Sequence, residues 1–284
     1  MLVEIAKNSK PASTRIQRAT FYKKPSTGFV FYRGASLIDG SPIVGVCLVG
    51  RSSNTKTGGM VQTYILRADT HPVEAVKNGS DESICGNCPH RLAMRYYFDK
   101  KTGKIKYGLR RTCYVNLGHG PTAVFSGLVR GIYPEISPHL LTKLRGRMLR
   151  VGTYGDPAAI PQSAWEPLFK SGIRGHTGYT HQWANPLGSV WIGRLMASVD
   201  NATERAEAWM RGWRTFSVLN TDETHKDAQS GTCPSSAEYI AKTGRKIQCE
   251  QCGLCDGGTA SVAIRGHGIG WVDQPNQTQR VNLL

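Results

Sequence analysis

The amino-acid sequence predicts an α/β protein built on a partial parallel βα barrel or an open sheet, with a β-rich N-terminal part and a C-terminal cysteine-ligated metal knuckle. Three observations support this class. Short apolar segments alternate with helix-like segments of about ten residues between residues 144 and 219, which is typical of βα units with parallel strands. Alternating apolar and polar residues occur within residues 35–75. Four of the eight cysteines follow residue 230 at close spacing.

These patterns divide the chain into four parts. Residues 1–33 are expected to form a basic arm that leads into a first strand, and residues 34–120 a β-rich segment with the first cysteine cluster. Residues 121–225 are expected to form the βα core, and residues 226–284 contain the second cysteine cluster and a tail. Within the β-rich segment, the apolar run Ile43 to Val49 predicts a buried strand.

The βα core is expected to contain four strands and two helices, bounded by residues that commonly end such elements. The strands are expected within Leu144–Tyr154, His176–Trp183, Leu195–Val199 and Trp213–Leu219, and the helices within PQSAWEPLFKSG and ATERAEAWMRG. Pro161 opens the first helix and Gly172 closes it. These units suffice for a partial barrel or an open sheet but not for a closed eight-unit barrel.

Polar residues stand where the expected strands end. Asp156 follows the first strand, His181 lies at the end of the second, and Asp200 follows the third. Because parallel sheets bind their ligands at the carboxyl ends of the strands, these three are the candidate catalytic residues. Each also has a structural interpretation, since Gly-Asp-Pro commonly starts a turn and a strand-end histidine is often structural.

The C-terminal cysteines are spaced for a metal. Cys249, Cys252 and Cys255 form a CxxCxxC run, and Cys233 precedes a proline a short loop upstream. This arrangement is typical of a four-iron cluster, whereas four thiolates around one ion would form a closed structural zinc site. Structural disulfides are not expected, because the chain is large and its first residues lack the apolar run of a secretory signal.

A second cluster of three cysteines lies earlier in the chain. Cys85 and Cys88 are two residues apart, and Cys113 follows a basic segment. With His90 or His119 as a fourth ligand they could hold a structural zinc ion. Without a fourth protein ligand they could hold a four-iron cluster with one iron open to substrate. Cys47 lies in an apolar run and is expected to be a buried small hydrophobic residue.

The formal net charge of +16 predicts a polyanionic partner, either nucleic acid or nucleotides, although charge can also serve solubility alone. No segment approaches the roughly 18 to 20 apolar residues that span a bilayer, so no membrane partner is expected. The candidate nucleic-acid-binding residues are Arg91, Arg95, Lys100, Lys101, Lys104, Lys106, Arg110 and Arg111. Tyrosines lie among them, as suits backbone contact with base stacking, but an exposed hairpin would give the same pattern.

Several segments together resemble an uncharacterised family encoded by bacteriophages and other mobile elements. These segments are SSNTKTGGMVQTYIL, ICGNCPH, RRTCYVNLGHGP, LRVGTYGDPAAIP, HTGYTHQW and CPSS…CEQCGLC, and they are spread over most of the chain. More distantly, the plan is similar to phage proteins related to radical S-adenosylmethionine enzymes. The signature of those enzymes packs three cysteines into CxxxCxxC, whereas here a whole basic segment separates Cys88 from Cys113.

The resemblance implies an α/β enzyme with two iron–sulfur clusters in the cytoplasm of a bacterial host. The early three cysteines would hold the open cluster, and the four C-terminal cysteines an auxiliary one. S-adenosylmethionine would be a cofactor, and Gly118 and Gly120 are the candidates for holding its methionine end.

Two functions from different classes therefore follow from the sequence. The first is an iron–sulfur enzyme, of the radical type, that modifies nucleic acid or nucleotides. The second is a nucleic-acid-binding protein in which zinc occupies both cysteine clusters as structural clips. A third, with less support, is an inhibitor of a host nucleic-acid machine. The enzyme predicts that Asp156, His181 and Asp200 converge on the early cysteines.

Overall fold

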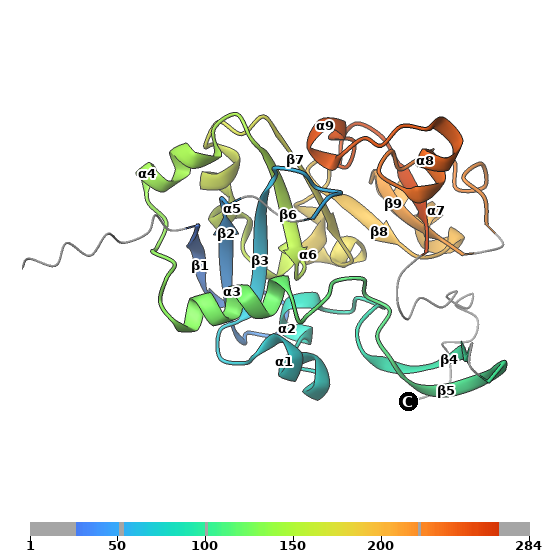
Figure 1. Ribbon diagram of the computed structural model, residues 1–284, viewed down its shortest axis with the longest axis horizontal. Coiled ribbons are helices and arrows are strands. Elements are labelled where there is room, and N and C mark those ends of the chain that lie inside the picture. The colour runs from blue at the N-terminus through green and yellow to red at the C-terminus, as the bar shows by residue number, and fades with distance from the viewer. Residues whose placement is uncertain (1–26, 51–53, 100–101, 221–222, 267–284) are drawn as a thin grey trace, which may run out of the picture.

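The computed structural model describes residues 27–50, 54–99, 102–220 and 223–266. These form a mixed α/β fold with a largely parallel nine-stranded sheet and a separate two-stranded antiparallel sheet (Figure 1). The order in the large sheet is β1-β2-β3-β6-β7-β8-β9-β11-β10. Its strands are β1 (Gly28–Ala35), β2 (Pro42–Leu48), β3 (Val61–Arg67), β6 (Met148–Tyr154), β7 (Gly175–Thr180), β8 (Met196–Val199), β9 (Thr215–Leu219), β10 (Gly231–Thr232) and β11 (Val262–Arg265).

The sheet changes from antiparallel to parallel at β3. Strands β1, β2 and β3 pair antiparallel, and β3 then pairs parallel with β6. From β3 to β11 the strands lie side by side in chain order and all run parallel. The carboxyl ends of six strands therefore lie along one edge of the sheet. Because β1 and β10 are the outer strands of this order, the sheet fits the open-sheet alternative, and a barrel is not confirmed.

Helices occupy the connections, as the alternation of segments predicts. They are α1 (Pro72–Asn78), α2 (Glu82–Cys85), α3 (Gly120–Val129), α4 (Pro138–Leu141), α5 (Gln162–Phe169), α6 (Pro186–Ser189), α7 (Ala202–Met210), α8 (Ala237–Thr243) and α9 (Cys249–Cys252). Helix α7 begins where its sequence predicts, because the side chain of Asn201 accepts a hydrogen bond from the backbone N–H of Glu204. Helices α1, α2 and α3 pack against β3, whose first six residues are buried.

The core is anchored by aromatic side chains. Trp165 on α5 is fully buried, and its ring lies 4.7 Å from Phe31 and 6.1 Å from Trp191 between centroids. Cys47 lies fully buried in β2, as expected. Within the described part of the chain, no helix combines the length and the apolar character needed to cross a membrane.

The antiparallel pair β4 (Ala93–Asp99) and β5 (Lys104–Arg110) forms the separate sheet. Figure 1 shows this hairpin projecting from the body, on the side where α1 and α2 lie. It is the basic segment between Cys88 and Cys113. We call residues 93–110 the basic hairpin.

Three features of the fold were not predicted. The β-rich segment joins the parallel strands in one sheet, because β3 pairs with β6. The sheet also extends into the C-terminal part, where β11 pairs with both β9 and β10. The strand expected from His176 to Trp183 ends at Thr180, and Gln182–Ala184 form a short 3₁₀ helix. Residues 1–26 of the expected basic arm lie outside the described residues.

Close packing between β6 and β7 gives a first prediction. A Cβ at Gly178 would lie 2.5 Å from a methyl carbon of Leu195 and 2.9 Å from the Cβ of Val151. We expect Gly178→Ala to lower the free energy of unfolding by about 1–3 kcal/mol, the usual cost of overpacking. Denaturant titration measures this difference.

Gly108→Ala is the matched control, since its Cβ would meet Tyr97 at an ordinary 3.7 Å. We expect it to change the free energy of unfolding by less than about 0.5 kcal/mol. Equal effects of the two substitutions would contradict the packing described for Gly178.

Candidate functional site

The three candidate catalytic residues lie together at the carboxyl ends of neighbouring strands. Asp156 follows β6, His181 follows β7 and Asp200 follows β8. All three are largely shielded from solvent, and Asp156 and Asp200 are only 7% and 2% exposed. Because β6, β7 and β8 are parallel neighbours, their ends bring these side chains to one place.

The carboxylate of Asp156 joins several of these ends. It accepts hydrogen bonds from the backbone N–H of Ala158 at 3.0 Å, from the hydroxyl of Thr180 at 2.8 Å and from the backbone N–H of His181 at 2.7 Å. The N–H of Asp156 itself donates to the carbonyl of Ile84 in α2 at 2.6 Å. Burial raises the pKa of Asp156 to about 6, and the hydrogen bonds it accepts limit the rise.

Two histidines share the carboxylate of Asp200. The Nε2 atom of His90 lies 2.8 Å from one oxygen, and Nε2 of His181 lies 3.7 Å from the other. Nδ1 of His90 is 2.8 Å from the hydroxyl of Thr112. Burial lowers the pKa of His181 to about 4, although the charge of Asp200 acts in the opposite direction. His181 is therefore a neutral imidazole near pH 7, able to accept a proton or bind a metal ion.

The early cysteines surround this group. Sγ of Cys88 lies 3.9 Å from Nε2 of His181, and the N–H of Cys113 donates to the carbonyl of His90 at 3.1 Å. The side-chain amide of Gln182 donates to the carbonyl of Cys85 at 3.2 Å. A Cβ at Gly86 would collide with Gln182, which explains the glycine in the CGNC sequence.

Burial raises the pKa of both Cys85 and Cys88, and neighbouring negative groups raise it further. Asp81 and Cys113 are among these groups for Cys85, and Cys85 and Cys113 for Cys88. These thiols therefore keep their protons at neutral pH unless a cation replaces them. Metal binding at such a set releases protons.

The C-terminal cysteines form a second set at the other side of the same region. Cys233, Cys249, Cys252 and Cys255 all line a small cavity of about 20 Å³. Backbone hydrogen bonds attach this set to the sheet: the N–H of Cys233 donates to the carbonyl of Ala263 in β11, and the carbonyl of Cys255 accepts from the N–H of Gly178 in β7. The N–H of Cys249 donates to the carbonyl of Lys56 in the loop before β3.

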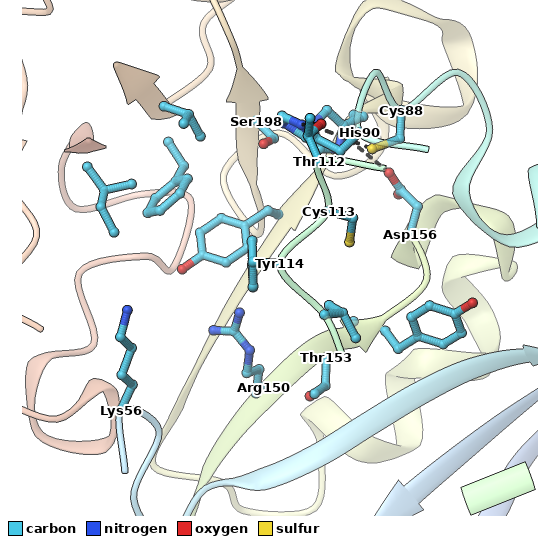
Figure 2. Close-up of a pocket in the computed structure, with 18 of the residues that line it drawn as sticks. Lys56, Cys88, His90, Thr112, Cys113, Tyr114, Arg150, Thr153, Asp156 and Ser198 are labelled. Atoms are coloured by element: carbon cyan, nitrogen blue, oxygen red, sulfur yellow. Dashed lines mark hydrogen bonds between the residues drawn. The ribbon is translucent and has the colours of Figure 1, made fainter. Parts of the chain in front are cut away.

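One larger cavity connects the two cysteine sets. Its volume is about 260 Å³, and it is lined by Cys85, Cys88 and Cys113 at one end and by Cys233 and Cys249 at the other. Figure 2 shows Cys88, Cys113 and Asp156 facing this space together with His90 and Tyr114. Residues that are more than a hundred positions apart in the chain therefore share one site.

The distances between possible metal-ligating atoms distinguish one compact group of side chains from the two sets of cysteines. Among the described residues, which include all eight cysteines, the group of three whose ligand atoms lie within 4.8 Å of one another is His90, His181 and Asp200. Four thiolates bound to one zinc ion at about 2.3 Å would lie about 3.8 Å apart and leave no water-sized space between them. Among the described residues no three of the thiols lie within 4.8 Å of one another, so neither set has this single-ion spacing.

The remaining predicted residues lie elsewhere. Gly120 is the first residue of α3, where a Cβ would meet the hydroxyl of Tyr64, and neither Gly118 nor Gly120 lines the cavity. Their assignment to S-adenosylmethionine stays a prediction without support from this placement. His119 precedes α3 and does not line the cavity either, whereas His90 does.

The eight candidate nucleic-acid-binding residues separate into three kinds. Arg91, Arg95 and Arg111 donate hydrogen bonds to nearby carbonyl groups, and Arg91 also pairs with Asp81. Lys104, Lys106 and Arg110 lie on β5 of the basic hairpin. Lys100 and Lys101 lie outside the described residues. The first kind holds the loop around the early cysteines in place.

The register of the basic hairpin places its exposed apolar and aromatic side chains on one face and its cations, with Tyr97, on the other. Met94 pairs with Leu109 and Tyr96 with Tyr107, so these four exposed side chains share one face. Alternation along β5 puts Lys104, Lys106 and Arg110 on the other face. The guanidinium of Arg110 lies 3.7 Å above the ring of Tyr97 there. The mixture of cations and aromatics in the sequence is therefore sorted by the strands.

Several residues of the cavity were not singled out from the sequence. Arg150 on β6, Tyr114, Tyr179 on β7 and Thr112 all line it. The signal that could have found Arg150 is its charge in the middle of the apolar strand MLRVGTY, where a cation needs a reason to be buried. No such signal marks the tyrosines.

Comparisons with protein-family models, with curated proteins and with solved structures found no match to this chain. The arrangement of the side chains themselves therefore carries the functional conclusion.

The buried carboxyl of Asp156 gives a prediction for stability against pH. Its folded pKa of about 6 exceeds the value of about 3.9 for an unfolded aspartate. The folded protein therefore binds this proton more tightly, which stabilises the fold fully below about pH 4. This contribution, about 3 kcal/mol for a shift of about two pKa units, is lost as the pH rises through about 6.

Asp156→Asn removes the titrating group while keeping the side-chain shape. We expect the unfolding free energy of the wild type, minus that of this variant, to fall as the pH is raised from 4 to 7. Chemical denaturation at matched metal content measures the two curves. Curves that stay parallel across this range would contradict the pKa assigned to Asp156.

Proposed function

We propose that the protein is an iron–sulfur enzyme of the radical type that acts on nucleic acid or nucleotides. One observation carries the proposal: three cysteines without a fourth thiol meet Asp156, His181 and Asp200 at the carboxyl ends of a parallel sheet. The three cysteines, Asp156 and His181 line a cavity that Cys233 and Cys249 of the second set also line. The convergence of catalytic candidates on the early cysteines is what an enzyme requires and a purely structural metal clip does not.

Under this proposal the residues that would hold the clusters are the two cysteine sets. Cys85, Cys88 and Cys113 would ligate three irons of a four-iron cluster, and the C-terminal four would ligate a second one completely. The absence of three thiols within 4.8 Å of one another among the described residues suits a multi-iron cluster better than a single ion. When bound, the open cluster would supply single electrons and an unoccupied iron position for substrate or S-adenosylmethionine. Reduced thiols of this kind favour a cytoplasmic location.

The chain's own side chains would handle protons and position the site. His181, neutral and 3.9 Å from Cys88, lines the cavity and can hydrogen-bond a ligand there. Asp200 orients His90 and His181, and Asp156 orders the backbone on both sides of the cavity through Ala158 and His181. Burial of both carboxylates excludes water from these contacts, which strengthens them.

Metal content tests the proposal directly. After anaerobic purification we expect about eight irons and eight sulfides per chain, and broad absorbance typical of iron–sulfur clusters, because two four-iron clusters would be present. Cys113→Ser should lose about half of the iron while retaining the circular dichroism of the folded protein. Cys47→Ala is the matched control, because Cys47 is buried in β2 and belongs to neither set.

A colourless protein with about two zinc ions per chain would overturn the enzyme proposal. It would leave the second candidate, a zinc-stabilised nucleic-acid-binding protein without catalysis. The basic hairpin favours that candidate, because it presents lysines on one exposed face beyond the body of the protein. Contact with nucleic acid is compatible with both functions, so the metal decides between them.

The hairpin lysines can be tested for contact with phosphates. Replacing Lys104 and Lys106 together by Ala should weaken binding to single-stranded DNA and RNA oligonucleotides. The slope of log affinity against log salt should fall by about 1.5, since each phosphate contact contributes about 0.7–0.9. Fluorescence anisotropy over a series of salt concentrations measures this slope.

Lys77→Ala with Lys170→Ala is the matched control, because it removes the same charge from exposed positions outside the basic hairpin. An equal loss of slope in both double variants would mean that net charge alone, and not the hairpin, drives binding.

A further inference from the structure

A buried arginine faces the cavity between the two cysteine sets. Arg150 lies in the middle of β6, its residue is 9% exposed, and its side chain lines the 260 Å³ cavity. Its side chain hydrogen-bonds that of Tyr179, but among the described residues no carboxylate forms an ion pair with it. A buried charge without an oppositely charged partner costs several kcal/mol, so buried arginines are normally paired with a carboxylate. An anionic group from a bound ligand would therefore stabilise the guanidinium of Arg150, which pairs with no carboxylate of the described residues.

The surroundings of Arg150 fit an anionic ligand. Its guanidinium carbon lies 5.3 Å from the centre of the Tyr179 ring, within the range of a cation–π contact. Figure 2 shows Arg150, Lys56 and Tyr114 directed into the same space from three different segments. Tyr179 also packs against Phe216, with 4.5 Å between ring centres. One end of the cavity is thus cationic with aromatic walls.

The acidic lining of the cavity lies at its other end. Among the described residues that line it, the one carboxylate is Asp156, which is engaged by hydrogen bonds from its own loop and from β7. Arg265, a further cation on the wall, pairs with Glu238. An anion entering the cavity would therefore meet Arg150 without displacing a protein carboxylate from it.

We infer that the cavity binds a small organic anion whose phosphate or carboxylate group pairs with the guanidinium of Arg150 and whose flat part contacts Tyr114 and Tyr179. A planar guanidinium suits both groups, because each offers two oxygens for parallel hydrogen bonds. The identification of this anion as the substrate rests on the proposed function. The binding of the anion itself requires no metal. A phosphate-bearing ligand would agree with nucleotides, and a carboxylate would point to another class of substrate.

Three probes that share one ring test the inference by calorimetric titration of the full-length protein. Phenyl phosphate and benzoate carry the two anionic groups, and benzyl alcohol is the neutral counterpart. We expect at least one anion to bind the wild type about tenfold or more tightly than benzyl alcohol does. The tighter of the two anions identifies the group that the site prefers. Binding of benzyl alcohol as tight as that of both anions would overturn the inference.

The variant Arg150→Gln tests whether anion binding depends on this residue. We expect about a tenfold or greater loss of anion affinity with little change for benzyl alcohol. Arg33→Gln removes the same charge from the exposed surface of β1 and should leave anion binding unchanged. If Arg150→Gln does not fold, the wild-type comparison of the three probes still decides, because it needs no variant.

A different role for Arg150 would give a different result. Cys249 is among the negative groups that act on Arg150, so the arginine could serve only to balance the thiolates of the C-terminal set. Arg150→Gln would then lower the iron or zinc content while anion binding stayed as in the wild type, which would overturn the inference. An unchanged metal content with lost anion binding supports it. Iron analysis on the same samples thus separates failure of the anion site from failure of the proposed iron–sulfur function.

Discussion

The carboxylate of Asp156 is the contact on which the site depends most. It receives hydrogen bonds from the segments that follow β6 and β7, while the N–H of the same residue holds α2, the helix that ends at Cys85. Three parts of the chain are therefore fixed relative to one another through one residue. A buried carboxylate with three donors is rigid, because each lost hydrogen bond would leave a polar group unsatisfied away from water. This rigid contact fixes the position of α2 and therefore of Cys85, the first of the early cysteines.

The parallel strands explain how distant residues come to share a cavity. The connections that follow β3, β6, β7 and β8 leave the same edge of the sheet, and they carry Cys85, Asp156, His181 and Asp200 in turn. The C-terminal cysteines reach the same region because β10 and β11 add to the sheet beyond β9. Both the catalytic candidates and the two thiol sets thus follow from strand order. Their chemistry differs because one set adjoins histidines and the other adjoins Tyr179 and Arg150.

Much of the fold could be predicted from the sequence, because β6, β8, β9, α5 and α7 each have a clear apolar period and clear end signals. The gathering of Asp156, His181 and Asp200 could also be predicted, since parallel strand ends meet at one edge. The pairing of β3 with β6 could not, because local periodicity says nothing about which distant strand is a neighbour. Nor could β11, a four-residue strand in a glycine-rich context. Arg150 was missed although its charge stands out in an apolar strand, because the sequence does not show whether a carboxylate pairs with it.

The basic hairpin has both of its ends at the early cysteines. Cys88 precedes β4, Cys113 follows β5, and the hydrogen bond from Cys113 to His90 closes the base of the loop. Any group that binds both thiols therefore also fixes the base from which the hairpin projects. By thermodynamic reciprocity, a molecule that binds the hairpin and prefers one position of its base must alter affinity at the thiols by the same factor. Binding at the exposed hairpin and binding at the buried cysteines are therefore energetically coupled through Cys88 and Cys113.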